Sequence, residues 1–340
     1  MKEKKRSTLQ TIANNLGLSR AAVSKALSNK SDISKKTIDL VNDEAKKLNY
    51  IANASAGALV TGRSEIVVGV FAQFSDASSK ISAGINEVLS NAGYKFTIIS
   101  SDKYYERQIQ DFNWARRIQA DGIIIDSLLP NDLFKEQIKN IDIPCVRFGL
   151  EATRLNNTDV GQVYINEVSA AKSAIEKFIE CGHKKIGLLM NSKYNVEKIR
   201  GAHLGAKKQV ELRTLHIENL DDSTLFDAVK DELSKKNKNS CTAFLCSGDL
   251  AAFKLIDLAR SKNIICPRDI SVIGFDDVVF SQYMEPALST VRVPCRTLGI
   301  KIGKLWLQMK QQENSNKKLK KYFTIDSEFI NRSSVGPKIN

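Results

Sequence analysis

Residues 8–27 have the sequence TLQTIANNLGLSRAAVSKAL, which predicts two short helices joined by a tight turn. Ile12 and Leu16 lie four residues apart on one face of the first helix, and the small Ala13 lets a second helix approach closely. Gly17 supplies the positive φ at which helices commonly end. The pattern is typical of a helix-turn-helix, whose second helix fits the major groove of DNA. A plain helical hairpin that makes no DNA contact is the alternative interpretation.

Polar residues occupy the helix starts and the outward face of this predicted motif. Thr8 and Ser19 each precede a helix, where a hydroxyl accepts a hydrogen bond from a free backbone N–H. Arg20 is suited to a bidentate contact with guanine, and Ala21 to contact with a thymine methyl group. The hydroxyl residues are expected to position the DNA backbone instead. The candidate DNA-binding residues of this segment are Thr8, Ser19, Arg20, Ala21, Ser24, Lys25 and Ser34.

Positive charge is concentrated at the amino end of the chain. Residues 1–64 hold 12 Lys and Arg against 5 Asp and Glu, a surplus of +7 out of the total of +13. The remaining surplus of +6 is spread over more than four times that length. Concentrated positive charge on a small domain favours contact with phosphates and predicts salt-sensitive binding. The run Lys317–Lys321 carries charge without a motif and is interpreted as solvated surface.

The stretch that follows completes the headpiece. Ser34 precedes a third helical pattern at 35–48, whose apolar stripe is formed by Ile38, Val41, Ala45 and Leu48. Together with LNYIANASAGALVTGRS at 48–64, the headpiece resembles the LacI/GalR family of bacterial transcription regulators. The resemblance implies a helix-turn-helix headpiece at 1–50, a hinge helix or linker at 51–64, and a two-lobed effector-binding and dimerisation domain at 65–340.

The hinge segment carries two further DNA-binding candidates, Asn53 and Leu59. In the family, the leucine that matches Leu59 wedges into a base step of the minor groove, and such a wedge bends the duplex. Leu59 packing on the next domain is the alternative. Gly57 stands where the family often has a long polar residue, and glycine disfavours helix by about 1 kcal/mol relative to alanine. We therefore expect this hinge to depend more on DNA for its folding.

The remaining 275 or so residues alternate short β-branched runs with amphipathic stretches. This alternation predicts an α/β fold of two doubly wound parallel-sheet lobes, and the resemblance implies a periplasmic-binding-protein-like body with a ligand cleft between them. Strands are predicted at 66–71, 96–99, 122–125, 144–148, 185–190, 213–217, 242–246 and 271–275, and helices at 81–91, 105–119, 132–139, 169–181, 196–210, 225–234 and 250–262.

Local motifs extend the resemblance over the body: ECGHKKIG at 180–187, SVIGFDD at 271–277 and PALSTV at 286–291. Ligands of doubly wound sheets bind beyond the carboxyl ends of the strands. Asp276 lies at such an end, where its carboxylate can accept two hydroxyl hydrogen bonds, and the matching family aspartate contacts the small molecule. A structural capping role is the alternative for Asp276, and it is the interpretation we favour for Asp277.

The other expected effector contacts depart from the family. Lys198 matches a position where the family usually has an arginine, and it offers a point charge in place of a bidentate fork. Gly248 replaces an amide-bearing residue, and the neighbouring Asp249 is expected to cap a helix. These changes leave three possibilities: a different sugar, a sugar phosphate held by Lys198, or no effector. On the first lobe the candidates are Phe74, Ser75 and Arg147.

Several function classes are not favoured by the composition. The three histidines lack metal-ligand spacing, and the six cysteines form no C-x-x-C pair and are expected to be free thiols. Because no phosphate-binding glycine loop or nucleophile elbow is present, we expect neither an enzyme nor a cofactor or metal site. The amino end has no signal peptide and no segment has the length of a membrane span, so we expect a cytoplasmic protein without membrane contact.

These expectations combine into one function. One recognition helix contacts too few base pairs for selectivity, so we expect a homodimer on a pseudo-palindromic, double-stranded operator, with tetramer formation left open. A sugar or sugar phosphate in the cleft would alter the affinity for DNA, as an inducer or as a co-repressor. The genes repressed would serve carbohydrate uptake or metabolism. The alternative is control by a phosphocarrier-type partner protein, or constitutive repression without a sugar ligand.

Overall fold

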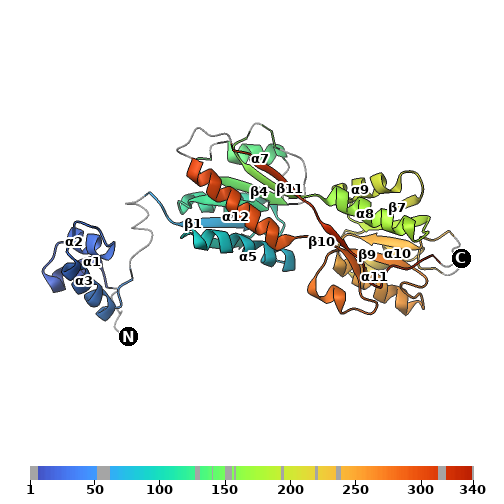
Figure 1. Cartoon of the computed structure of the whole chain (residues 1–340), viewed down its shortest axis with the longest axis horizontal. Helices are drawn as coiled ribbons and strands as arrows, with labels where there is room; N and C mark the ends of the chain where they lie inside the picture. Colours follow the sequence, from blue (N-terminus) through green and yellow to red (C-terminus); the bar gives the residue numbers. More distant parts are fainter. Residues whose placement is uncertain are drawn as a thin grey trace. The chain divides into compact units, whose positions relative to one another are not determined.

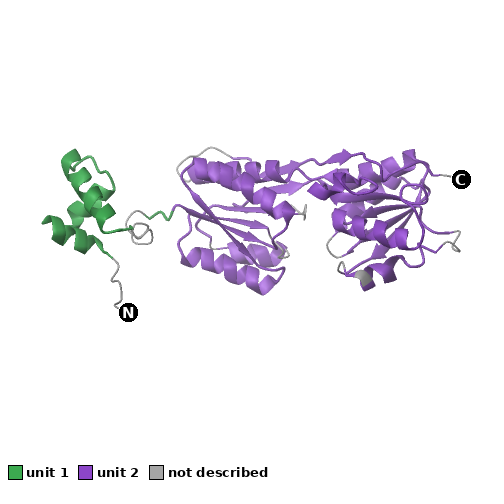
Figure 2. Cartoon of the chain, turned by 90° about the horizontal axis from the view of Figure 1, so that it is seen from below, with its two compact units in different colours: residues 1–64 green, residues 65–340 purple. Residues whose placement is uncertain are grey.

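The computed structural model describes residues 7–51, 62–126, 131–139, 141–149, 155–156, 158–192, 195–218, 221–234, 239–312 and 319–338. The chain forms two compact units, which comprise residues 1–64 and 65–340 (Figure 2). Asn53, Gly57 and Leu59 lie outside the described residues, so the expectations for the hinge stay predictions.

The first unit is a bundle of three short helices: α1 (Leu9–Leu16), α2 (Arg20–Leu27) and α3 (Lys35–Lys47). Gly17 ends α1 with a φ of 64°, as predicted. Thr8 accepts a hydrogen bond from Thr11 N, and Ser19 one from Ala22 N, which confirms both predicted caps. The apolar faces meet in one small core, whose buried members are Ile12, Ala13, Val23, Ala26, Val41 and Ala45.

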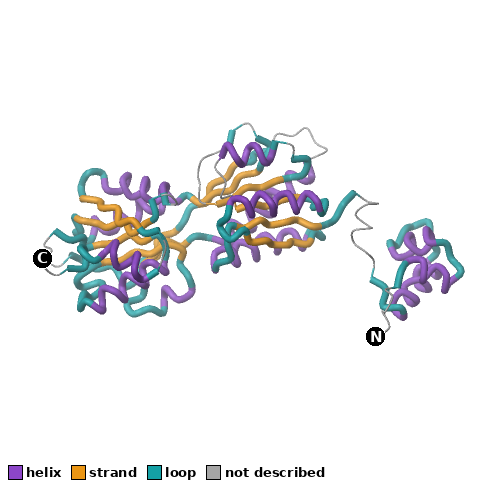
Figure 3. Tube along the Cα trace, turned by 180° about the vertical axis from the view of Figure 1, so that it is seen from behind, coloured by secondary structure: helices purple, strands orange, loops and turns teal. Residues whose placement is uncertain are grey.

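The second unit contains two α/β lobes, each built on a six-stranded sheet covered by helices on both faces (Figures 1 and 3). The first sheet is entirely parallel, in the order β11-β5-β4-β3-β1-β2. Helices α5 (Asp76–Asn91) and α12 (Cys295–Gln312) contribute to the core on one face, and α6 (Tyr105–Arg117) and α7 (Asn131–Ile138) to that on the other. Its strands are β1 (Ile66–Phe71), β2 (Lys95–Ser100), β3 (Gly122–Asp126), β4 (Cys145–Gly149), β5 (Gly161–Ile165) and β11 (Tyr322–Ile325).

The second sheet has the order β12-β10-β9-β8-β6-β7, and its edge strand β12 runs antiparallel to β10. Helices α8 (Glu167–Glu180) and α9 (Val196–Ala206) pack into one core, and α10 (Asp222–Val229) and α11 (Asp249–Ser261) into the other. The short 3-10 helix η1 (Val279–Gln282) follows β9. The strands are β6 (Lys185–Met190), β7 (Glu211–His216), β8 (Ala243–Cys246), β9 (Ser271–Asp276), β10 (Ser289–Arg292) and β12 (Glu328–Ile330).

The central strands are largely apolar because both faces of each sheet are covered. In β1, the residues Val67, Val68 and Val70 have no exposed surface, and in β3 the same holds for Ile123 and Ile124. The predicted fold class, two doubly wound lobes behind a helical headpiece, is confirmed. No helix among the described segments is both long and apolar enough to cross a membrane.

The connections between the lobes differ from a simple repeat of one lobe after the other. The chain passes between the sheets three times: after β5, after β10 and after β11 (Figure 1). Helix α12 therefore returns to the first lobe, where it packs closely on α5. The glycines at 84 and 299 allow this close approach, since a Cβ at either position would overlap the backbone of the facing helix. The sequence patterns did not predict β5, β10, β11, β12, η1 or α12.

Candidate functional site

The outward face of α2 carries the DNA-binding candidates. The side chains of Val23 and Ala26 are buried in the headpiece core, and those on the opposite side of the helix are exposed. The exposed candidates on α2 are Arg20, Ala21, Ser24 and Lys25. Ser34 caps α3 by accepting a hydrogen bond from Thr37 N, so it plays the same local role as Thr8 and Ser19. The helix thus offers a cation at its start and a second cation one turn later.

That second cation is not free in the headpiece. Lys25 Nζ donates a hydrogen bond to Asp32 Oδ2, and both side chains are 53% exposed. Asp32 lies in the turn between α2 and α3 and was not among the sequence candidates. The hydrogen bond from Lys25 holds the pKa of Asp32 below its usual value. A lysine on the recognition face is therefore neutralised by a carboxylate of the same unit.

On the first lobe, the three predicted effector contacts lie in different environments. Phe74 is 66% exposed, so its ring is not part of the lobe's core. Ser75 caps α5 by accepting a hydrogen bond from Ser78 N at 3.2 Å. Arg147 is buried, where its Nη1 donates to Asn131 Oδ1 at 2.6 Å and its guanidinium lies 4.9 Å from the centre of the Phe134 ring.

A buried acid lies near Arg147. Asp126, the last residue of β3, accepts a hydrogen bond from Ala72 N at 3.4 Å. Burial raises the pKa of Asp126 to about 6, and the hydrogen bond and the charge of Arg147 oppose that rise. Since Arg147 interacts with Asp126 and donates to Asn131, part of its binding capacity is already used within the lobe.

On the second lobe, the buried Lys198 and the half-buried Asp276 belong to one polar cluster. Lys198 is 4% exposed, and its Nζ donates to Ser247 O at 2.8 Å. The same nitrogen lies 3.4 Å from Glu167 Oε1 and 3.8 Å from the centre of the Phe275 ring. Glu167, which begins α8, is 2% exposed and was not a sequence candidate. A hydrogen-bonded carbonyl, a carboxylate and an aromatic face thus surround this ammonium group.

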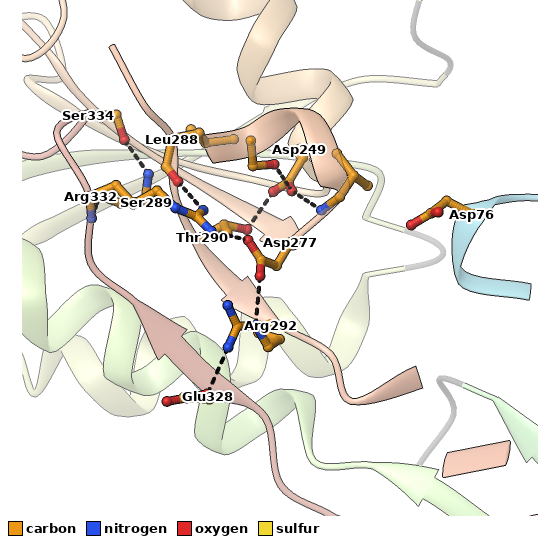
Figure 4. A network of polar contacts seen from close by, with 12 residues as sticks. Asp76, Asp249, Asp277, Leu288, Ser289, Thr290, Arg292, Glu328, Arg332 and Ser334 are labelled. Atoms are coloured by element: carbon orange, nitrogen blue, oxygen red, sulfur yellow. Dashed lines mark hydrogen bonds and ion pairs between the residues drawn. The ribbon is translucent and has the colours of Figure 1, made fainter. Parts of the chain in front are cut away.

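Asp276 ends β9 with a φ of 107°, a conformation that side-chain-bearing residues rarely adopt. Burial raises its pKa to about 7. Lys198 opposes the rise, while the charges of Asp249, Glu167 and Asp76 add to it. Asp76 belongs to α5 of the first lobe, so carboxylates from both lobes act on Asp276. Figure 4 shows Asp76 and Asp249, one from each lobe.

Gly248 lies next to this carboxylate. A Cβ on Gly248 would lie 3.2 Å from Asp276 Oδ2, and its φ of −165° is extended backbone that any residue adopts. A side chain at position 248 would therefore sit beside the Asp276 carboxylate. Because this chain has glycine at 248, no side chain from that position lies beside Asp276, as the sequence indicated.

The two other aspartates of this region hold the lobe together (Figure 4). Asp249 does not cap α11 as expected, because Gly248 occupies the cap position. Its carboxylate, 1% exposed, accepts hydrogen bonds from Thr290 Oγ1, Ser281 Oγ and Val278 N.

Asp277 is likewise engaged, in ion pairs with Arg292 at 2.7 Å and Arg332 at 2.6 Å. Burial would raise the pKa of Asp277, but the hydrogen bonds from the two arginines outweigh burial and lower it. Its role is structural, as favoured from the sequence, although it acts through ion pairs and not through a helix cap.

Comparison with known proteins agrees with the helical headpiece and the two-lobed α/β body. A model of the periplasmic binding protein-like domain matches residues 175–335. The chain is 27% identical to the probable HTH-type transcriptional repressor ExuR of Bacillus subtilis (strain 168), over 96% of this chain and 98% of that protein.

Two solved structures share the fold. The Lac repressor dimer bound to operator and the anti-inducer ONPF has a TM-score of 0.83 at 20% identity, covering 98% of this chain and 100% of that one. The complex of the transcriptional regulator CelR with cellobiose has a TM-score of 0.66 at 19% identity, covering 97% and 100%. The curated relatives are transcriptional regulators and not enzymes, and they match from the headpiece to the end of the body. These similarities extend over nearly the whole chain and agree with its resemblance to the LacI/GalR family of bacterial transcriptional regulators.

Proposed function

We propose that the chain represses carbohydrate genes by binding a pseudo-palindromic operator as a homodimer, and that a sugar bound near Asp276 changes its affinity for DNA. The observation that carries the DNA-binding part is the exposed face of α2, with Arg20 at its start and Ser24 and Lys25 one turn later. A structural relative, the Lac repressor, is a dimer on its operator. Asn53 and Leu59 complete the proposed DNA contacts from the hinge.

The homodimer is supported by exposed apolar side chains on the second lobe. Leu250 and Val279 are each 53% exposed, Phe280 70% and Tyr283 74%. They lie close together because Asp249, beside Leu250, accepts hydrogen bonds from Val278 N and Ser281 Oγ. Large apolar groups gathered on a surface mark a contact site. We assign this surface to contact with a second copy of the chain.

The effector part rests on the cluster around Asp276. Its carboxylate can accept hydrogen bonds from ligand hydroxyls at the carboxyl end of β9, where doubly wound sheets bind ligands. A relative, CelR, has been solved with cellobiose. We propose Asp276 and Lys198 as the second-lobe residues of the site, and Phe74, Ser75 and Arg147 as those of the first lobe.

Selection of duplexes from a random-sequence library tests the DNA-binding part. The full chain is expected to enrich a two-fold symmetric site, and Arg20→Ala is expected to relax base preference at one position of each half-site by about 1–3 kcal/mol. The charge-matched control is Lys46→Ala on α3, which should leave base preference unchanged.

Uniform weakening by Arg20→Ala across all sequences would make Arg20 a phosphate contact and contradict its base-reading role. Failure of the full chain to enrich any site, with or without sugars, would overturn the proposed function.

A further inference from the structure

The polar cluster around Asp276 has an unusual distribution of charge. Lys198 is its cation, and three separate groups already engage that cation: the carbonyl of Ser247, the carboxylate of Glu167 and the ring of Phe275. Burial raises the pKa of Glu167, whereas the charge of Lys198 opposes that rise and favours the ionised carboxylate. The ionised Glu167 balances the lysine, which then has no charge to spare for a ligand phosphate. Lys198 thus differs from an exposed phosphate-binding lysine.

Carboxylates outnumber cations near the end of β9. Glu167, Asp249 and Asp76 all act electrostatically on Asp276, and Lys198 is the cation that opposes them. An anionic ligand placed beside Asp276 would either meet its negative charge or raise the pKa of that carboxyl group further above about 7, and both cost free energy in the interior. A ligand that donates hydrogen bonds meets acceptors instead.

The two carboxylates differ in whether a ligand donor can reach them. Glu167 Oε1 is buried and has an ion pair with Lys198 but no hydrogen bond within the described part of the chain. Asp276 Oδ2 borders the space that a Cβ on Gly248 would enter. Because glycine leaves that space free of side-chain atoms, a ligand donor can approach the Asp276 carboxylate from the side of Gly248.

We propose that this site selects a non-anionic sugar, neutral or amino-substituted, that donates hydrogen bonds to Asp276, and that Glu167 enforces the selection by neutralising Lys198. The inference deepens the proposed function, because it names the chemical class of the effector. It removes the sugar phosphate from the three possibilities that the sequence left open. Glu167 acts here as a positioning residue, through Lys198.

Titration calorimetry on the full chain with matched sugars tests this proposal. The probes are glucose, glucosamine, glucuronate and glucose 6-phosphate, together with the corresponding galactose set. We expect the neutral or amino member of a set to bind at least about tenfold more tightly than its anionic members. Tightest binding of a uronate or a phosphate would overturn the inference and leave the proposed function standing. Silence from both sets, with operator binding intact, would overturn the sugar-effector part and this inference with it.

Glu167→Gln tests the assigned cause. The substitution keeps the shape of the side chain and releases Lys198 from its balancing charge. The affinity ratio of anionic to neutral probe should therefore rise by at least about tenfold. Glu176→Gln on the same helix is the charge-matched control, because Glu176 pairs with Lys172 and Lys207 at the surface. An unchanged ratio in Glu167→Gln would refute the assigned role of Glu167.

Gly248→Leu provides a second test that does not disturb the ion pair, because an apolar side chain at position 248 cannot supply the amide contact that this chain lacks. Its side chain would fill the space beside Asp276 Oδ2. The extended backbone accommodates a side chain, while the Asp276 carboxylate, 3.2 Å from the new Cβ, must shift slightly. We expect the affinity for the favoured probe to fall by at least about tenfold while operator affinity is retained. Unaltered sugar affinity would show that no ligand donor reaches Asp276 from this side, and would overturn that part of the proposal.

Discussion

The recognition face of α2 and the cluster around Asp276 hold their polar side chains in opposite ways. On α2, the side chains are exposed and their partners are near in sequence: Ser19 bonds to a residue three positions away and Lys25 to one seven positions away. Around Asp276, the side chains are buried and bond across 29 to 49 residues. The exposed side chains of α2 are available to an external partner. Around Asp276, most polar groups already have hydrogen-bond partners within the protein, so a ligand can bond only to the groups that remain.

The largest expected difference between the two regions concerns stability. Asp249→Ala would leave Thr290, Ser281 and Val278 N without their shared acceptor, and each buried group left unpaired costs about 1–3 kcal/mol. We expect the free energy of unfolding of the second unit to fall by at least about 3 kcal/mol. Urea titration followed by tryptophan fluorescence measures this unit, because Trp114 and Trp306 both belong to it.

Asp257→Ala is the matched control for that experiment. Asp257 lies on the same helix and is exposed, with a surface ion pair to Arg260, so its removal should change the unfolding free energy little. Equal effects of the two substitutions would mean that the Asp249 network does not hold the lobe together.

A smaller effect is expected from pH. A free aspartate loses its proton near pH 4, whereas the folded chain raises the pKa of Asp276 to about 7. The folded state therefore binds this proton more tightly, and its contribution to stability is complete below about pH 4 and is lost as the pH rises through 7. Each unit of pKa shift corresponds to about 1.4 kcal/mol, and the partial exposure of Asp276 reduces the effect.

The check is a comparison of wild type with Asp276→Asn in urea titrations from pH 4.5 to 7.5. Asp126 and other groups titrate in both proteins, so only the difference in slope belongs to Asp276. The wild type should lose stability relative to the variant as the pH rises. Parallel curves would show that burial does not perturb this carboxyl group.

The same contrast explains what could be predicted from the sequence. The caps at Thr8 and Ser19 and the turn at Gly17 depend on neighbours within a few residues, and the structure confirms them. Several helix bounds were less accurate: α5 begins at Asp76 and not at residue 81. Asp276 was placed correctly at the end of β9, since a strand end is also a local feature. Its role in binding a ligand stays a prediction.

The rest depends on contacts between distant parts of the chain. The residues next to Glu167 in the sequence do not indicate that it pairs with Lys198. Those next to Asp249 do not indicate that its carboxylate accepts three hydrogen bonds from residues beyond 277. Helix α12 escaped prediction for the related reason that it packs against α5, more than 200 residues earlier in the same lobe, after the chain has returned from the other lobe. Periodicity indicates that a segment is buried, but not which lobe buries it.

The smallest expected effect concerns the ion pair between Lys25, on the exposed face of α2, and Asp32. Because Lys25 is paired with Asp32, forming a phosphate contact through Lys25 requires breaking that pair. Exposed pairs are weak, so the DNA can compete for the lysine. Asp32→Asn should free the lysine and steepen the dependence of the logarithm of the binding constant on that of salt concentration, by about 0.9 for one added phosphate contact.

Binding of a random-sequence duplex at several salt concentrations measures this slope without knowledge of the operator. Asp39→Asn is the control, because it removes the same charge from an exposed position on α3. If Asp32→Asn and Asp39→Asn change the slope equally, only the net charge of the headpiece matters. If Asp32→Asn alone steepens it, Asp32 restrains a lysine that would otherwise bind any DNA. The headpiece, like the proposed effector site, would then limit its partners by neutralising one of its own cations.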